Sequence, residues 1–117
     1  MPFTPGRPIA EAKAELFKAL AHPARIRVLE LLADREHTVG ELADATGMEM
    51  SHLSQQLSVL RRTGIVVSRR VKNTVFCSLA DPDTSALLAV ARRMLTKNLR
   101  RGQELLAELD GDGSATR

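Results

Sequence analysis

The chain has 117 residues, of which 44% are hydrophobic and 26% are charged, and this balance is typical of one globular domain. No apolar run approaches the roughly 20 residues that cross a bilayer, and the single cysteine, Cys77, excludes an intramolecular disulfide, so we expect a cytoplasmic protein. The net charge of +3 is only a weak indication of a polyanionic partner.

The first third of the chain has the pattern of an arm followed by two helices. Residues 1–8 contain three prolines and a glycine, and we expect a flexible arm there. Apolar side chains recur at helical spacing over residues 9–20, which predicts a first helix. Pro23 suits the first position of a second helix, because its missing N–H would have no partner there. That helix is predicted to end near Ala33, and residues 34–37 are predicted to be a polar loop.

Two short helices separated by a tight turn are predicted next. Thr38 and Glu41 have the spacing of a capping box at the start of the third helix, and Thr46-Gly47 is expected to end it. The fourth helix covers residues 50–62, with an apolar face formed by Leu53, Leu57 and Leu60. Its other positions carry hydroxyls, amides and an imidazole, but no acid.

The sequence period then changes from 3.6 to 2. The runs IVVSRRV and TVFCSL predict two strands joined by Lys72-Asn73, a β-hairpin with a basic tip. A last helix is expected over residues 82–109, and residues 110–117 are expected to be a disordered tail. The predicted protein is mainly α with a small β-hairpin, in the order α-α-α-α-β-β-α, and forms a single domain over residues 9–109.

Charge is unevenly distributed along this order. Residues 50–80 contain no Asp or Glu, although even spreading of the 14 acids would put about four there. The same window holds five basic residues: Arg61, Arg62, Arg69, Arg70 and Lys72. One contiguous segment therefore lacks acidic residues and is rich in basic residues.

A short helix, a tight turn, a second helix and a basic hairpin predict a winged helix-turn-helix. In that fold the second helix lies in the DNA major groove, and polar side chains in its first turns reach base edges. A carboxylate on that helix would face phosphates, which explains the missing acids. The residues predicted to contact double-stranded DNA are Ser51, His52, Ser54, Gln55, Gln56, Arg61, Arg62, Arg69, Arg70, Lys72 and Asn73.

Three stretches carry a resemblance to a known family, and the resemblance covers roughly residues 14–98. They are LFKALAHPARIRVLELL, then VGELADATG, then SHLSQQLSVLRRTGIVVSRRVKNTVFCSL. These stretches resemble the ArsR/SmtB family of bacterial repressors. The resemblance implies a homodimer that binds an inverted-repeat operator in a promoter and leaves it when an effector arrives.

The resemblance also implies that the first and last helices, residues 9–20 and 82–109, form the dimer surface. An apolar stripe on the last helix fits this, since one small domain would hardly bury it; the alternative is that the helix folds back on its own core. The expected interface residues are Leu16, Leu20, Leu87, Leu88, Ala91, Met94, Leu95 and Leu99.

The metal-sensing positions of the family are not retained in this chain. One family site begins the third helix with Cys-x-Cys, where this sequence has Thr38-Val39-Gly40. The other uses Asp-x-His and later His-x-x-Glu on the last helix, where this sequence has Asp81 and Asp83, then Met94 and Lys97. The usual nickel or zinc set is therefore broken. Asp81 and Asp83 remain weak candidates and are more simply residues that start a helix.

Three alternatives remain open at the level of sequence. The first is a metal sensor with a non-standard nickel or zinc site across the dimer. The second is a thiol redox sensor through Cys77, although a buried inert thiol is the simpler interpretation. The third is a winged helix that contacts only proteins. No nucleophile elbow, phosphate loop or H-E-x-x-H motif is present, so we do not expect an enzyme.

Overall fold

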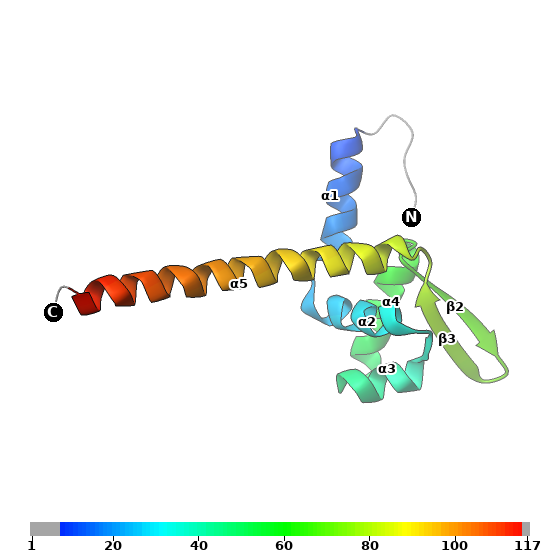
Figure 1. Cartoon of the computed structure of the whole chain (residues 1–117). Helices are drawn as coiled ribbons and strands as arrows, with labels where there is room; N and C mark the ends of the chain where they lie inside the picture. Colours follow the sequence, from blue (N-terminus) through cyan, green and yellow to red (C-terminus); the bar gives the residue numbers. More distant parts are fainter. Residues whose placement is uncertain (1–7, 116–117) are drawn as a thin grey trace. The chain divides into compact units, whose positions relative to one another are not determined.

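The computed structural model describes residues 8–115, and the side chains of residues 8–111 (Figure 1). The elements in chain order are α1 (Ile9–Leu20), α2 (Pro23–Asp34), β1 (His37–Thr38), α3 (Val39–Thr46), α4 (Met50–Arg62), β2 (Val66–Val71), β3 (Thr74–Leu79) and α5 (Asp83–Ala115). The chain divides into two compact units, of which the first ends at Ser85 and the second begins at Ala86. The mainly helical class, the five helices and the β-hairpin are confirmed. The arm predicted for residues 1–8 lies almost wholly outside the described residues.

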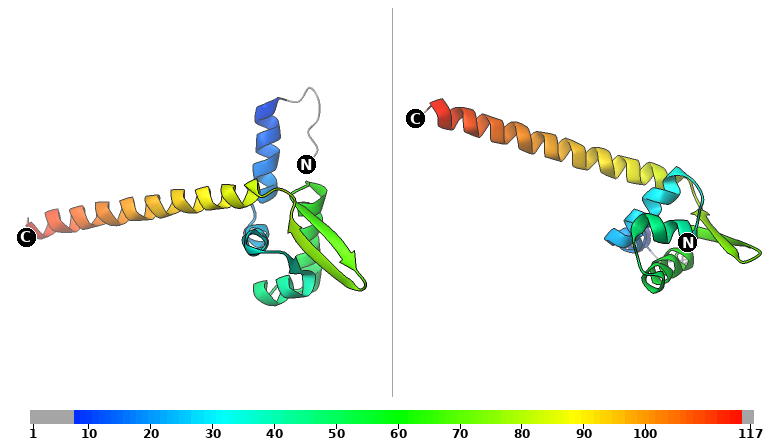
Figure 2. Two further views of the ribbon diagram at one scale, coloured as in Figure 1. Left: turned by 45° about the vertical axis from the view of Figure 1, so that its right-hand side comes forward. Right: turned by 90° about the horizontal axis from the view of Figure 1, so that it is seen from below.

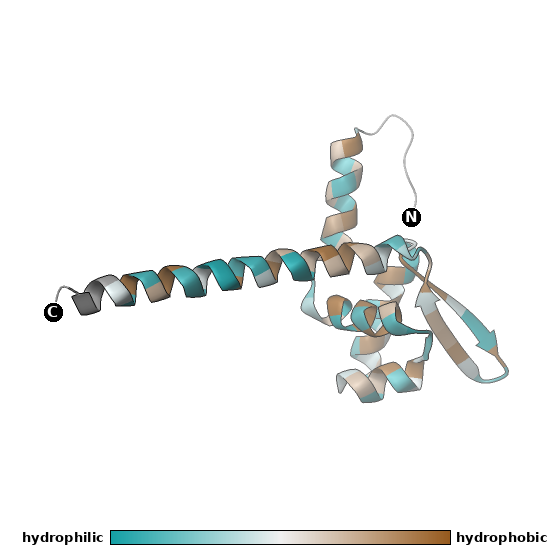
Figure 3. Ribbon diagram, viewed as in Figure 1, coloured by the Kyte–Doolittle hydropathy of each residue, from teal (hydrophilic) through white to brown (hydrophobic). Residues whose placement is uncertain are grey.

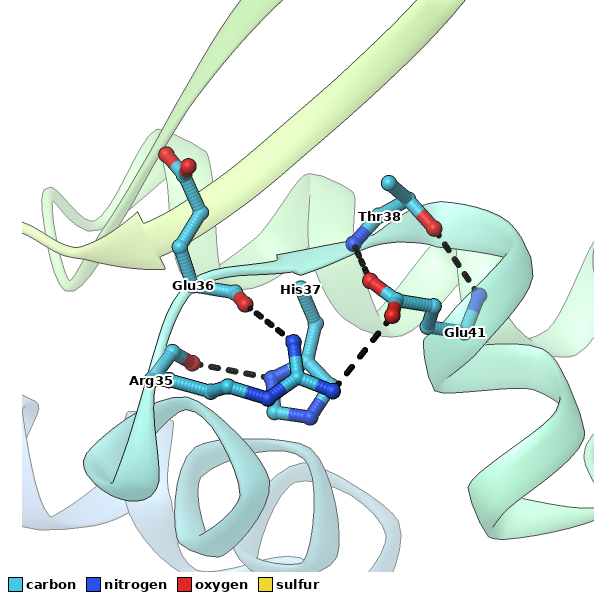
Figure 4. Close-up of polar contacts among 5 residues, drawn as sticks. All are labelled: Arg35, Glu36, His37, Thr38 and Glu41. Atoms are coloured by element: carbon cyan, nitrogen blue, oxygen red, sulfur yellow. Dashed lines mark hydrogen bonds and ion pairs between the residues drawn. The ribbon is translucent and has the colours of Figure 1, made fainter.

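Local signals in the sequence set the starts of α2 and α3. His22 is the N-cap of α2, where its Nδ1 accepts a hydrogen bond from the Ala24 N–H at 3.2 Å. At α3 the Thr38 hydroxyl accepts from the Glu41 N–H at 3.1 Å, and the Glu41 carboxylate accepts from the Thr38 N–H at 2.8 Å (Figure 4). This reciprocal capping box satisfies amides that the helix itself leaves unpaired. The predicted capping box is therefore confirmed.

The core of the first unit is aliphatic and lies among α2, α3, α4 and the hairpin. Its largest fully buried side chains are Val28, Leu29, Leu42, Leu53, Leu57, Leu60, Val66 and Cys77. Burial of each leucine is worth about 1.5–3 kcal/mol relative to exposure in water. This core holds the outer faces of α4 and the hairpin in place. Figure 2 shows the hairpin extending away from the helices of this unit.

The sheet has three strands in the order β1-β3-β2, all antiparallel. The strand β1 was not predicted, since two residues are too few to show an alternating pattern. His37 pairs with Cys77 in this strand and is buried, with its Nδ1 2.8 Å from the Arg35 carbonyl oxygen. The prediction of a polar loop through His37 is therefore wrong at its last residue.

The helix α5 begins after an Asx turn in which the Asp81 carboxylate accepts from the Asp83 N–H at 2.8 Å. It continues to Ala115, six residues past the predicted end at Leu109. The disordered tail expected from residue 110 is thus helical through Ala115, because extending a formed helix by one residue costs far less than starting one. Residues 116–117 lie outside the described part of the chain. No helix among the described residues has the length and apolar content to cross a membrane.

Candidate nucleic-acid interface

The turn between α3 and α4 is fixed by one buried threonine and one arginine. The Thr46 hydroxyl donates to the Leu42 carbonyl at 2.7 Å and accepts from the Met48 N–H at 3.2 Å. Arg27 of α2 donates to the Thr46 carbonyl at 2.7 Å. Gly47 follows with φ 71, a left-handed conformation that glycine adopts without steric cost. The angle between the two helices is thereby set by contacts of the chain itself.

The helix α4 has one buried face and one polar, exposed face. Leu53, Leu57 and Leu60 are buried against the core. The first two turns expose four short polar side chains, and the last turn exposes two arginines. These outward residues are Ser51, His52, Ser54, Gln55, Arg61 and Arg62. No acid lies within the helix, and the nearest one is Glu49 at its N-cap. All six were predicted to face a DNA duplex, and all six are accessible.

Gln56 does not belong to this exposed face. Its side chain is buried, with 8% exposure, and its Oε1 accepts a hydrogen bond from Arg25 Nε at 3.0 Å. Gln56 lies three residues after Leu53, which puts it on the apolar face of the helix. The prediction that Gln56 reads DNA is therefore wrong, and its amide serves as an internal link to α2. Arg25 also donates to the Ala19 carbonyl at 2.8 Å, so one side chain joins α1, α2 and α4.

The hairpin presents its cations at and beside the tip. Arg70, Lys72 and Asn73 are exposed. Lys72 has φ 56, a conformation that is uncommon outside glycine, asparagine and aspartate. The strand pairing from Val66 with Leu79 to Val71 with Thr74 leaves only Lys72 and Asn73 in the turn, as predicted.

Arg69 is held by groups of its own chain. It donates to the Glu36 carboxylate through Nε at 3.2 Å and through Nη2 at 2.8 Å. Its guanidinium lies 4.5 Å from the centroid of the Phe76 ring, a cation–π geometry. The Glu36 carboxylate raises the pKa of Arg69 further above its ordinary value. Arg69 is exposed, so its contact with DNA stays a prediction, and a phosphate would have to compete with the Glu36 carboxylate for its guanidinium.

A second contact links α4 to the hairpin. Arg61 Nη1 donates to the Ser68 hydroxyl at 3.3 Å. The Ser68 oxygen lies in turn 3.6 Å from Cys77 Sγ, within the sheet. Both Arg61 and Ser68 are exposed, so the Arg61 guanidinium retains donors that face solvent. The recognition-type helix and the hairpin are thus joined on their outer side.

A groove of about 510 Å³ lies where α3, α4 and the hairpin tip meet. Its lining includes Gly40 from the first turn of α3, Ser54 and Arg61 from α4, and Asn73 and Thr74 from the hairpin. Gly40 and Thr74 were not among the residues predicted from the sequence. The lining also includes the apolar side chains of Val39, Met50, Leu57 and Val75, and Arg61 is its one charged residue. The groove is therefore of mixed polar and apolar character.

The residues predicted for a dimer surface divide into three groups by exposure. Leu20 and Leu88 are already buried in a single chain, so neither offers much apolar area to a second one. Leu16 and Leu87 are half-buried, and the remaining four residues are exposed. Those four are Ala91, Met94, Leu95 and Leu99. Further along the same helix Leu105, Leu106 and Leu109 are exposed as well. Figure 3 shows hydrophobic positions recurring between hydrophilic ones along α5.

The other candidate groups have local structural roles. Asp81 forms the Asx turn described above, and no group of three His, Cys, Asp or Glu with metal-binding geometry occurs among the described residues. Cys77 is fully buried, as predicted. Burial of a thiol removes it from solvent oxidants, so the structure does not favour the redox alternative.

Comparison with known proteins decides the family. Residues 22–68 match the sequence profile described as "Bacterial regulatory protein, arsR family". The chain is 53% identical over 110 residues to the uncharacterized HTH-type transcriptional regulator Rv0081 of Mycobacterium tuberculosis, covering 93% of this chain and 96% of that protein. This protein belongs to the ArsR family. It is a transcriptional regulator with a winged helix-turn-helix fold.

Two further relatives have names that state a direction of regulation. The transcriptional activator HlyU of Vibrio cholerae is 34% identical over 102 residues, with 80% of this chain and 94% of that protein covered. The biofilm growth-associated repressor of Agrobacterium fabrum is 44% identical over 75 residues, with 64% of each chain covered.

Solved structures agree on the fold. The crystal structure of Rv0081 superposes with a TM-score of 0.75 at 54% identity, covering 82% of this chain and 97% of that one. The solution structure of a winged helix-turn-helix DNA-binding domain, Mb0332 from Mycobacterium bovis, gives a TM-score of 0.72 at 29% identity, with 84% and 95% covered. That domain is described as homodimeric.

Proposed function

We propose that this regulator acts as a homodimer that represses transcription by binding an inverted-repeat operator. The observation that carries the proposal is the exposed face of α4, which presents hydroxyls, amides and arginines without an acid beside a hairpin with a cationic tip. Such a surface matches a polyanion that also carries hydrogen-bonding groups in a groove.

Base recognition is assigned to the first turns of α4. Ser51, His52, Ser54 and Gln55 are exposed there, at the end of a helix that enters a major groove in this fold. The Gln55 amide suits a bidentate contact with adenine, and the serine hydroxyls suit either a donor or an acceptor on a base edge. Gln56 is left out of this set because its amide is buried and occupied by Arg25.

Phosphate contacts are assigned to the cations around this helix. Arg61 and Arg62 lie in its last turn, while Arg70 and Lys72, with Asn73, lie at the hairpin tip. Contacts of this kind position a protein on the duplex and make its affinity strongly dependent on salt. Arg69 is exposed as well, but a phosphate would have to compete with the Glu36 carboxylate for its guanidinium.

The homodimer is supported by the exposed apolar residues of α5 and by the homodimeric state of Mb0332. Two recognition helices related by a two-fold axis read half-sites about 34–36 Å apart, which is one turn of DNA. An inverted repeat with that spacing is therefore the expected operator. The exposed residues of α5 that we assign to contact with the partner chain are Ala91, Met94, Leu95 and Leu99.

Repression is the proposed direction because a dimer seated on promoter DNA excludes other proteins from the same surface. The name of the Agrobacterium relative supports this direction, and the name of the Vibrio relative points the other way. Transcription from the protein's own promoter, measured with and without the purified protein, decides between them. No observation on the described residues favours a nickel or zinc effector or a Cys77 switch over an effector of another kind.

The proposal is tested by titrating the protein against a fragment of its own promoter and against a random duplex of the same length. The variant S54A/Q55A should lose affinity for the promoter fragment by about tenfold or more, since each good base contact is worth about 1–3 kcal/mol. Its affinity for random DNA should change little. The control T96A/Q103A removes two exposed polar groups from α5 and should leave both affinities unchanged.

Two results would count against the proposal. If no promoter fragment binds at low salt, the DNA-binding assignment fails. If S54A/Q55A weakens promoter and random DNA equally, the residues are not base readers.

A further inference from the structure

A second cationic surface lies on α5, a different element from those assigned to operator recognition. Residues 84–103 contain five basic residues and no acid. These basic residues are Arg92, Arg93, Lys97, Arg100 and Arg101, and all five are exposed. The dense hydroxyl and amide chemistry of α4 is absent here, so the surface differs in kind from the proposed base-reading face.

Four of the five cations share one side of the helix. At about 100° per residue, Arg93, Lys97, Arg100 and Arg101 fall within an arc of about 100°. We call these four residues the basic face. Leu95, Leu99 and Leu106 lie on roughly the opposite side of the helix. Arg92 lies on the flank between the two and does not belong to the basic face.

The cations of the basic face form no ion pair in the part of the chain that the structure describes. Among the described residues, no ion pair or side-chain hydrogen bond engages any of its four cations. Arg93 and Lys97, and again Lys97 and Arg101, stand four residues apart, a like-charge spacing that destabilises a helix. The first acid beyond them is Glu104, three residues after Arg101 and four after Arg100, which offsets part of the charge at that end of the face. A helix built this way is stabilised when a polyanion covers it.

We propose that the basic face of α5 binds the phosphate backbone of duplex DNA without regard to sequence. The choice of DNA as the occupant rests on the proposed function. The Cα atoms of Arg93 and Arg101 are separated by about 12 Å along the axis, at about 1.5 Å per residue. A DNA strand advances about 3.4 Å along its axis per phosphate, so the face spans about three phosphates.

The composition of the face favours a phosphate backbone over a protein partner. Three of its four cations are arginines, whose planar fork donates two parallel hydrogen bonds to one phosphate. Protein interfaces are instead anchored by buried aromatic or apolar residues at their centre. The helix α5 contains no aromatic residue, and its exposed Leu95, Leu99 and Leu106 lie on the other side. Val90 falls within the arc of the basic face and Met94 lies beside it, but neither is an aromatic anchor. Recognition mainly by charge suits the DNA backbone.

The proposal is tested with the full chain carrying R93Q/K97Q/R101Q, titrated against random and promoter duplexes over a range of salt concentrations. The slope of log affinity against log salt should fall by about 0.9 for each phosphate that the variant no longer neutralises, or about 2–3 per chain. Both duplexes should lose affinity by the same factor. The matched control K13Q/K18Q/R92Q removes the same total charge from exposed positions off the face.

Two comparisons can overturn the proposal. If R93Q/K97Q/R101Q has the slope and affinity of the control, the basic face does not touch DNA, even if it is then found to bind an acidic polypeptide. The charge-preserving variant R93K/R101K should retain the slope; if it loses as much as the glutamine variant, the effect is structural and the proposal fails. A failure of the proposed function shows instead in S54A/Q55A, which carries an intact basic face.

Discussion

The link between Arg25 and Gln56 gives a prediction that separates an internal role from a role at the DNA surface. Replacement of Arg25 by alanine removes two charge-assisted hydrogen bonds, of 2.8 Å to the Ala19 carbonyl and 3.0 Å to the Gln56 amide. Bonds to charged groups contribute about 1.5–3 kcal/mol each, but both bonds are only partly buried, so water replaces part of what is lost. We therefore expect Arg25→Ala to lower the free energy of unfolding by about 2–4 kcal/mol.

Part of that decrease comes from the Gln56 amide, which is left buried without a partner. A buried acceptor that loses its donor costs about 1–3 kcal/mol. Leucine is similar in size to glutamine and has no hydrogen-bond acceptor. The loss of unfolding free energy caused by Gln56→Leu should therefore be smaller in the Arg25→Ala protein than in the unchanged protein. The double-mutant cycle should thus give a coupling energy of about 1–2 kcal/mol.

The assay is urea unfolding of the four proteins at one protomer concentration, since oligomerisation shifts apparent stability. Additivity of the two single changes within about 0.5 kcal/mol would refute the link, because only residues that interact show a coupling above that level. Titration of Gln56→Leu against promoter and random DNA completes the test. Its discrimination should match that of the unchanged protein, whereas S54A/Q55A should lose discrimination.

Three further predictions concern the dimer, the capping box and the hairpin. Leu99→Glu should weaken the dimer by about a hundredfold or more in sedimentation, since each of two buried leucines contributes roughly 1.5–3 kcal/mol, and intact dimers would place the interface elsewhere. The Thr38 N–H, and next Arg35, lower the pKa of Glu41, so its contribution to stability is present above its unfolded pKa and is lost as pH falls through the lower folded value. Glu41→Gln should therefore be less stable than the unchanged protein at neutral pH, and a gap that fails to narrow in acid would contradict this. Glu36→Gln removes one negative charge and releases the Arg69 guanidinium, so it should strengthen binding to all DNA with little change in the urea midpoint; weaker binding would contradict this.

The elements that the sequence predicted well are those with a local chemical signature. The bounds of α4, the capping box of α3 and the two-residue hairpin turn each follow from residues within a few positions of one another. Their spacing is enough because helix caps and tight turns are decided by neighbouring backbone groups.

The elements that were missed depend on partners far along the chain. The strand β1 exists through its pairing with β3, and Arg69 is occupied by Glu36, 33 residues away. Gln56 is different, since a signal was present: with Leu53, Leu57 and Leu60 it completes the i, i+3, i+4, i+7 pattern of a buried face. The buried position of Gln56 was not predicted because its side chain is polar. A buried amide needs a hydrogen-bond partner, here Arg25, and residue spacing alone does not identify that partner.

Lys72 shows how stability and binding can oppose each other at one residue. Its left-handed backbone is one in which a side chain is strained and glycine is not. A glycine at this position would relax the turn and stabilise the hairpin, but it would also remove the cation from the tip. Selection for the most stable hairpin would therefore favour glycine, whereas selection for DNA affinity would favour lysine. A substitution at Lys72 would change the affinity for all DNA without changing which sequence is read. The strength of operator binding can therefore be set at this residue separately from its sequence specificity.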